Sequence, residues 1–203
     1  MKNITFEDKK ITPSKIVCVG RNYVEHIQEL NNEVPENMVL FNKPNSAISD
    51  ELYFFENTRF EGEICFLIEN NQISGIGFGF DLTKVDIQNY LKSKGLPWER
   101  AKAFNKSAVF SEFVKFDGDL SKIEMKLFKN NNLIQHANYE LMIYKPSQIL
   151  QEIQTFMDLD DGDIIMSGTP KGVGFYEIDD IFKAQILVEN KIILEKIFKV
   201  KGE

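Results

Sequence analysis

The chain has 203 residues, of which 43% are hydrophobic, so it can bury a core of one sizeable domain or two small ones. The net charge of -7 argues against a general nucleic-acid binder, since such proteins normally present a basic surface. No run approaches the ~18 apolar residues of a membrane span, and the first residues lack the apolar core of a signal peptide. The two cysteines, Cys18 and Cys65, lie in apolar segments, which indicates buried thiols in a reducing compartment. We therefore expect a cytoplasmic protein that binds neither nucleic acid nor a membrane.

Strand-forming segments outnumber helical ones along the chain. Strands are expected at residues 16–20, 39–41, 60–68, 76–81, 107–114, 124–129, 133–136, 163–166, 183–188 and 192–200, with hairpin turns at 129–133 and 188–191. Helices are expected at residues 23–30, from Thr83 to a stop at Gly95, and at 146–157, the last with Ile149, Ile153 and Phe156 on its inner face. Because strands and helices do not alternate regularly, we predict one β-rich α+β domain over residues 1–203, with an antiparallel or mixed sheet.

The strand at residues 60–68 carries Glu61 and Glu63, whose side chains point to the same face because successive residues of a strand alternate. Two neighbouring carboxylates on an apolar strand repel each other and are costly to desolvate. A hard divalent cation resolves both problems, since carboxylate oxygens are its preferred ligands. The alternative is a strand end that emerges into water, with both glutamates solvated.

A second acidic position closes the next strand. Phe78 and Phe80 alternate with glycines, as expected for a strand beside a crowded neighbour, and Asp81 follows them. Thr83, with Asp86 three residues later, fits the start of a helix. Asp81 would then lie at a strand-to-helix junction, where it is either a ligand or an ordinary turn aspartate.

Two further segments carry polar residues that could act in catalysis. His26 and Glu29 have i, i+3 spacing, so a helix places them on one face, where a carboxylate beside an imidazole makes a general base. An exposed helix with incidental polar residues is the alternative. Lys102 stands between alanines and before Phe104, either as a desolvated cation facing an anion or as a surface lysine packed on aromatic rings. The glycine-rich loop at residues 167–174 follows an apolar strand and can present backbone N–H groups to a carboxylate, or it is a tight turn.

Together, in this order, these motifs closely resemble the fumarylacetoacetate hydrolase family, and more narrowly its short, single-domain acylpyruvase branch. The resemblance extends from about Lys15 to Val200. It rests on Gly20-Arg21-Asn22-Tyr23 with His26 and Glu29, Glu61-x-Glu63, Asp81-Leu82-Thr83 with Asp86 and Gln88, Lys102-Ala103-Phe104, and Ser167-Gly168-Thr169-Pro170-Lys171-Gly172-Val173-Gly174.

The resemblance implies a mixed β-roll, usually a homodimer, with a Mg²⁺ or Mn²⁺ site and a small 2-oxo acid as substrate. By matching motifs, the metal ligands would be Glu61, Glu63 and Asp81. The catalytic residues would be a water-activating dyad on a lid, His26 and Glu29, and an oxyanion-stabilising lysine, Lys102. The substrate-binding residues would be Arg21, Asn22, Gln88, Gly168 and Thr169.

The chain departs from the family pattern at positions that leave the substrate open. Val85 stands where many relatives have an arginine, and Arg59 and Phe60 stand where a histidine is common. We expect hydrolysis of a C–C bond in an acylpyruvate such as acetylpyruvate or fumarylpyruvate, because the dyad is intact. The alternatives are a decarboxylase or an isomerase or tautomerase of diacids such as oxaloacetate or 2-hydroxyhepta-2,4-dienedioate, and a non-catalytic β-domain used for binding or dimer assembly.

Overall fold

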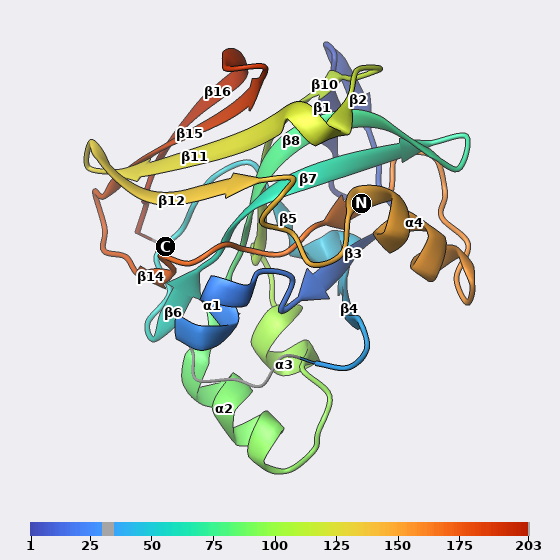
Figure 1. Cartoon of the computed structure of the whole chain (residues 1–203). Coiled ribbons are helices and arrows are strands. Elements are labelled where there is room, and N and C mark those ends of the chain that lie inside the picture. Colours follow the sequence, from blue (N-terminus) through green and yellow to red (C-terminus); the bar gives the residue numbers. More distant parts are fainter. Residues whose placement is uncertain (30–34, 203) are drawn as a thin grey trace.

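The computed structural model describes residues 1–29 and 35–202, and in this part of the chain the strands form three sheets (Figure 1). The strands of the largest sheet are β1 (Ile4–Phe6), β2 (Lys9–Ile11), β3 (Lys15–Gly20), β4 (Val39–Pro44), β5 (Ile48–Ser49), β7 (Gly62–Glu69), β8 (Gln72–Asp81), β10 (Ala108–Lys115) and β13 (Ile164–Met166). Their order is β2-β1-β10-β8-β7-β13-β3-β4, with β5 beside β10. The sheet is mixed, because β13 runs parallel to β3 and antiparallel to β7.

Two smaller sheets and four α-helices complete the described fold. The four-stranded sheet has the order β12-β11-β15-β16 and consists of β11 (Ile123–Lys129), β12 (Asn132–Asn138), β15 (Ile181–Val188) and β16 (Lys191–Lys199). The three-stranded sheet consists of β6 (Thr58–Phe60), β9 (Thr83–Lys84) and β14 (Gly174–Phe175). The helices are α1 (Val24–Glu29), α2 (Val85–Ser93), α3 (Glu99–Lys102) and α4 (Pro146–Gln154), with short 3-10 turns at Asn45–Ala47 and Leu120–Lys122.

The predicted β-rich α+β architecture is confirmed, and local turn chemistry explains much of it. Both predicted hairpin turns are present, at Asn130–Asn131 and at Glu189–Asn190, and a third turn of this kind at Asn70–Asn71 joins β7 to β8. Each turn has two consecutive residues with positive φ, the conformation that matches the right-handed twist of the flanking strands.

Three predicted details are wrong, and the end of a fourth predicted element lies outside the described residues. Thr83 does not cap a helix: it belongs to β9 and pairs with Arg59, and α2 begins at Val85. The strand predicted over residues 60–68 is interrupted at Glu61, between β6 and β7. Helix α4 ends at Gln154, so Phe156 is exposed on the surface instead of packing inward. The helix predicted at 23–30 is α1, and its last predicted residue lies outside the described residues.

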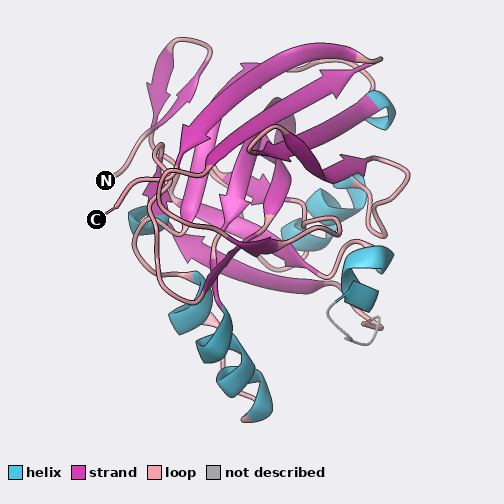
Figure 2. Cartoon of the chain, turned by 90° about the vertical axis from the view of Figure 1, so that its left-hand side faces the viewer, coloured by secondary structure: helices cyan, strands magenta, loops and turns pink. Residues whose placement is uncertain are grey.

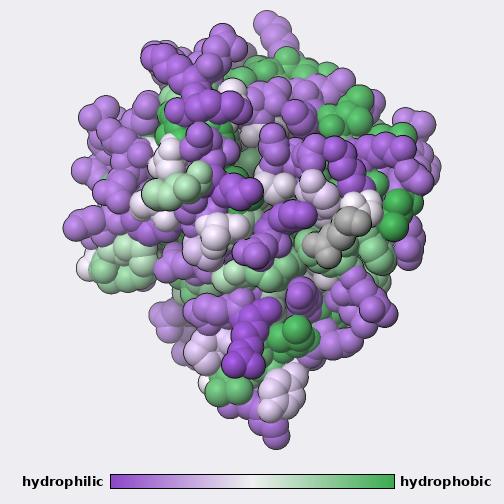
Figure 3. Space-filling model, turned by 180° about the vertical axis from the view of Figure 1, so that it is seen from behind, coloured by the Kyte–Doolittle hydropathy of each residue, from purple (hydrophilic) through white to green (hydrophobic). Residues whose placement is uncertain are grey.

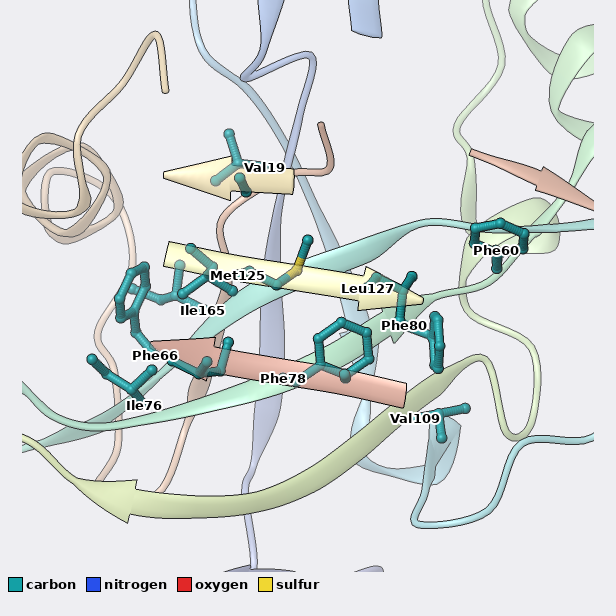
Figure 4. Packing of buried hydrophobic residues seen from close by; sticks show 14 of the residues in the cluster. Val19, Phe60, Phe66, Ile76, Phe78, Phe80, Val109, Met125, Leu127 and Ile165 are labelled. Atoms are coloured by element: carbon teal, nitrogen blue, oxygen red, sulfur yellow. The ribbon is translucent and has the colours of Figure 1, made fainter. Parts of the chain in front are cut away.

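The core lies between the large sheet and the four-stranded sheet. Figure 4 shows Met125 and Leu127 of β11 packed near Phe66 and Phe78, which come from the two central strands β7 and β8. Residues that alternate with these point to the opposite face, where a second cluster contains both free cysteines, as expected. The glycines of β8 lie beside a crowded neighbouring strand, as expected, since a Cβ on Gly77 would meet the Phe113 ring at 2.9 Å.

Helices α1, α2 and α3 gather on one side of the molecule, away from α4 (Figure 1), and α2 projects outward from the sheets (Figure 2). The face seen in Figure 3 is mostly hydrophilic, with hydrophobic side chains in small scattered groups. In the part of the chain that the structure describes, no helix is long and apolar enough to cross a membrane. The polar residues singled out in the sequence converge where the three helices meet the ends of β7 and β8.

Candidate metal centre and active site

Three carboxylates meet at one end of the β7–β8 hairpin. Antiparallel pairing sets Glu63 opposite Gly79, and the backbone N–H of Asp81 donates to the carbonyl of Glu61 at 2.9 Å. One oxygen from each of Glu61, Glu63 and Asp81 lies within 4.8 Å of the others, and all three residues are at most 5% exposed. The solvated strand end considered for Glu61 and Glu63 is therefore wrong, and the three predicted ligands form one buried cluster.

Three basic side chains hold this acidic cluster in place. The Nζ of Lys102, at the end of α3, lies 2.8 Å from Glu61 Oε2 and 2.5 Å from Asp81 Oδ2. Arg59 donates through Nε and Nη2 to Glu61 Oε1, at 3.0 and 2.6 Å. Lys43 of β4 lies 2.8 Å from Asp81 Oδ1. Lys102 is buried, so it is not the surface lysine considered as an alternative.

The surroundings shift the pKa values of the acids in opposite directions. Burial alone would raise the pKa of the Glu61 carboxyl, but the charges of Lys102 and Arg59 outweigh it and hold that pKa well below its usual range. Burial, together with the negative charges of Asp81 and Glu61, raises the pKa of Glu63 well above its usual range. Glu63 is thus the carboxyl that most lacks a compensating charge, although the N–H of Gly168 donates to its Oε2 at 2.8 Å.

The donor set fits a hard divalent cation such as Mg²⁺ or Mn²⁺. Such ions take carboxylate oxygens, and one or two carboxylates plus substrate oxygens are their usual ligands in enzymes. Lys102, Arg59 and Lys43 pair with Glu61 and Asp81 but not with Glu63. A cation beside Glu63 would supply the positive charge that this carboxyl lacks. Glu61, Glu63 and Asp81 are the described residues that could hold it.

Because the pKa of Glu63 is raised, a bound metal ion has to displace a proton from that carboxyl. We therefore expect Mg²⁺ binding to release protons, and the affinity for Mg²⁺ to fall as the pH is lowered through the raised pKa of Glu63. Calorimetric titration with Mg²⁺ in two buffers of different ionisation enthalpy measures the number of protons released. A proton release that does not increase as the pH is lowered, over the range in which the protein stays folded, would contradict the raised pKa.

The predicted dyad lies at the same pocket. His26 is only 6% exposed, and its Nδ1 lies 3.2 Å from Glu29 Oε2. The Glu29 carboxylate also accepts a hydrogen bond from the N–H of Gly172 at 3.0 Å, so the glycine-rich loop fixes the acid that orients the ring. Burial lowers the pKa of His26, against the charges of Glu61 and Glu29, which keeps the imidazole neutral and able to accept a proton at neutral pH.

The remaining predicted residues divide into two groups. Arg21, Gln88 and Thr169 line the pocket together with the acidic cluster. Asn22 is fully buried, and its side-chain amide bonds the backbone at Tyr144 and Ser167, while the Gly168 N–H is taken by Glu63. In this structure Asn22 and Gly168 shape the loop beside the pocket. The roles assigned to all these residues stay predictions.

Sequence reasoning missed three basic residues of the site: Lys43, Arg59 and Lys92. Lys43 comes before a proline at the end of a strand, which is typical of an exposed turn, yet it is fully buried. Arg59 departs from the family pattern, and its i, i+2 spacing from Glu61 is a usable signal for a contact between them. Lys92 of α2 carries no local sign of its place in the pocket beyond its i, i+4 spacing from Gln88.

Comparison with known proteins identifies the family of this chain. The model of the fumarylacetoacetate (FAA) hydrolase C-terminal family matches residues 15–197, almost the whole chain. The chain belongs to this family. The expected fold type is confirmed by the crystal structure of a fumarylacetoacetate isomerase/hydrolase-like protein from Oleispira antarctica. That protein is 33% identical to this chain, and the two superpose with a TM-score of 0.92 over 98% of this chain and 100% of the other.

Two relatives of the family have more specific names. Oxaloacetate tautomerase YcgM of Escherichia coli is 36% identical over 181 residues, which cover 79% of this chain and 83% of that protein. Fumarylpyruvate hydrolase of Pseudomonas aeruginosa, solved with Mn²⁺ and pyruvate, is 24% identical, with a TM-score of 0.89 over 100% of this chain and 96% of that one. At that identity the second likeness establishes a common fold. The chain is therefore an enzyme of this family with a buried acidic site.

Proposed function

We propose that this protein is a metal-dependent tautomerase of a small 2-oxo diacid such as oxaloacetate. The observation that carries the proposal is the buried imidazole of His26 in the same pocket as the three-carboxylate cluster and Lys102. Tautomerisation needs a group that carries a proton and a group that stabilises an enolate, and the pocket holds both. The likeness to an oxaloacetate tautomerase supports this reaction.

The proposed step is a proton transfer between oxygen and carbon. In the enol-to-keto direction the O–H bond at C2 breaks and a C–H bond forms at C3, with no change in oxidation state. The neutral ring of His26 accepts the hydroxyl proton and returns it to C3, while Glu29 holds the ring and stabilises its charged form. No attacking water is required.

Lys102 supplies positive charge where the enolate oxygen becomes negative. Burial disfavours its ammonium, but Asp81 and Glu61 raise the pKa of Lys102 above its usual range, so it stays charged throughout the reaction. A Mg²⁺ or Mn²⁺ ion held by Glu61, Glu63 and Asp81 would supply Lewis-acid stabilisation of the same negative charge. Arg21, Gln88 and Thr169 would orient the 2-oxo acid in the pocket.

Hydrolysis of an acylpyruvate is the second candidate, and the His26–Glu29 pair favours it. A base held at 3.2 Å from a carboxylate can activate water as well as carry a substrate proton. Hydrolysis differs by needing an attacking water and a scissile C–C bond.

The homodimer expected from the family resemblance also stays a prediction. Light scattering of the purified protein measures its oligomeric state.

One set of assays decides between these reactions. The purified protein with Mg²⁺ is given enol-oxaloacetate, acetylpyruvate and fumarylpyruvate, and loss of the enol absorbance, hydrolysis, and decarboxylation to pyruvate are followed separately. A tautomerase rate that depends on Mg²⁺ and exceeds the other rates supports the proposal. Hydrolysis of acetylpyruvate or fumarylpyruvate as the dominant reaction would replace it with the second candidate, and absence of all turnover would favour the non-catalytic domain.

Replacing His26 with alanine is expected to reduce kcat for tautomerisation by about 10²- to 10⁴-fold, the usual contribution of a positioned acid–base group. Acylpyruvate hydrolysis should fall with it, because both reactions use the imidazole. Decarboxylation of oxaloacetate needs neither water attack nor this proton transfer and should survive. Initial rates for the three reactions, each measured at saturating substrate, test the assignment.

The chain offers a matched control, since its second histidine, His136, is exposed on β12 and pairs with Glu124 at 3.0 Å. His136→Ala should leave all three rates within twofold. Equal loss of decarboxylation and tautomerisation in His26→Ala would show that the ring supports the site as a whole and carries no proton.

A further inference from the structure

A half-buried lysine lies in the pocket beside the residues of the proposed reaction. Lys92 comes one turn after Gln88 on α2, so the two side chains share a face of the helix, and both line the pocket that contains the carboxylate cluster. Gln88 is 5% exposed whereas Lys92 is only partly buried, which places Lys92 on the outer side of Gln88. Its Nζ lies 5.2 Å from the centre of the Trp98 ring, which also lines the pocket.

Lys92 forms no ion pair with residues 1–29 or 35–202, whereas Arg59 and Lys102, which also line the pocket, pair with Glu61 and Asp81. Burial and the positive charges of Arg21, Arg59 and Lys102 lower the pKa of Lys92 to about 8, although Glu61 opposes them. The positive potential at this position is therefore unbalanced. An anion that reached Lys92 would relieve repulsion as well as form a new ion pair.

We propose that Lys92 binds the second carboxylate of a diacid substrate, the one farther from the 2-oxo group. The inference deepens the proposed function and rests on it: the 2-oxo acid end belongs at the cluster of Glu61, Glu63 and Asp81, beside the buried Gln88. The outer end of the substrate then lies toward Lys92. A monoacid such as acetylpyruvate leaves Lys92 without a partner, so Lys92 makes the site selective for diacids.

Two unreactive 2-hydroxy acids test this role without turnover. Malate and lactate share the chelating 2-hydroxy acid end, and malate adds the second carboxylate. Calorimetry of the Mg²⁺-loaded protein gives the ratio of their Kd values, which should favour malate in the wild type. In Lys92→Met the Kd of malate is expected to rise about tenfold, the size of one lost charge-assisted hydrogen bond, while the Kd of lactate stays within twofold.

Two further variants control the measurement. Lys92→Arg keeps the charge and should recover most of the malate affinity. Lys94→Met removes an exposed lysine two residues along the same helix end and should leave both Kd values unchanged. Retained lactate binding by Lys92→Met shows that this variant folds and keeps its cluster. The KM for oxaloacetate should rise in parallel with the malate Kd.

Two results would overturn this inference without affecting the proposed function. One is an unchanged ratio of the malate and lactate Kd values in Lys92→Met. The other is an equal loss of affinity for both ligands, which would assign Lys92 to the chelating end or to folding. Both can occur in a protein that still tautomerises oxaloacetate. Failure of the proposed function gives a different result: the wild-type protein would turn over no 2-oxo acid and would bind neither malate nor lactate. That result would contradict the proposed active site and, with it, the role of Lys92.

Discussion

Replacing Glu63 with glutamine is expected to lower Mg²⁺-dependent turnover by roughly 10³-fold, because a metal ion supplies several kcal/mol of charge stabilisation and each 1.36 kcal/mol is tenfold in rate. The amide keeps an oxygen that can accept the Gly168 N–H, so the loop should stay in place. Glutamine also resembles the protonated form of Glu63, which burial and the negative charges of Asp81 and Glu61 favour. The metal-free variant should therefore unfold at the same temperature as the wild type or a higher one, although it is inactive.

Thermal unfolding with and without Mg²⁺ separates this result from simple misfolding. A ligand that binds only the folded state raises the melting temperature, so Mg²⁺ with oxalate should shift the wild type and leave Glu63→Gln unshifted. Glu69→Gln, at the other end of the same strand, is the matched control and should behave as the wild type. A Glu63→Gln protein that keeps both the Mg²⁺-induced shift and full turnover would remove the metal centre from the proposal.

The large strands and their turns could be predicted because their causes are local. The apolar runs of β3 and β7 and the turns at Asn130–Asn131 and Glu189–Asn190 are visible within a few residues. The three ligands of the cluster were predictable for a related reason: acidic residues on an apolar strand, or at its end, need a compensating charge. A cation or a basic partner was therefore required somewhere, but the sequence did not say which residue would provide it.

The parts that were missed depend on partners far away in the chain. Thr83 has the composition of a helix cap, but pairing with Arg59 of β6 draws it into a strand. Phe156 has helical spacing from Ile153, yet α4 ends before it. Two basic partners of the acids, Lys43 on β4 and Lys102 on α3, reach the cluster only through folding, whereas Arg59 stands two residues before Glu61. The sequence shows that the buried acids need compensating positive charge, but it does not show which residues provide all of it.

The dependence on partners far away in the chain should have its largest effect on stability at Lys43. Its Nζ lies 2.8 Å from Asp81 and donates to the carbonyls of Leu82, Lys102 and Ser107, in a place with no access to water. Lys43→Met keeps the volume but leaves these acceptors unsatisfied and a buried ion pair broken. We expect the free energy of unfolding to fall by about 3–5 kcal/mol, as measured for broken buried pairs, and urea denaturation measures it.

The control is an ion pair of similar length on the surface: Lys199 lies 2.8 Å from Asp179, with both side chains more than half exposed. Lys199→Met should change the free energy of unfolding by less than about 1 kcal/mol, since solvent screens such a pair. Lys43→Met/Asp81→Asn should recover part of the loss, because the second change removes the acid that lost its partner. If Lys43→Met cost no more than Lys199→Met, Lys43 would not be holding Asp81 and the Lys102 turn together, and the geometry of the whole cluster would need another cause.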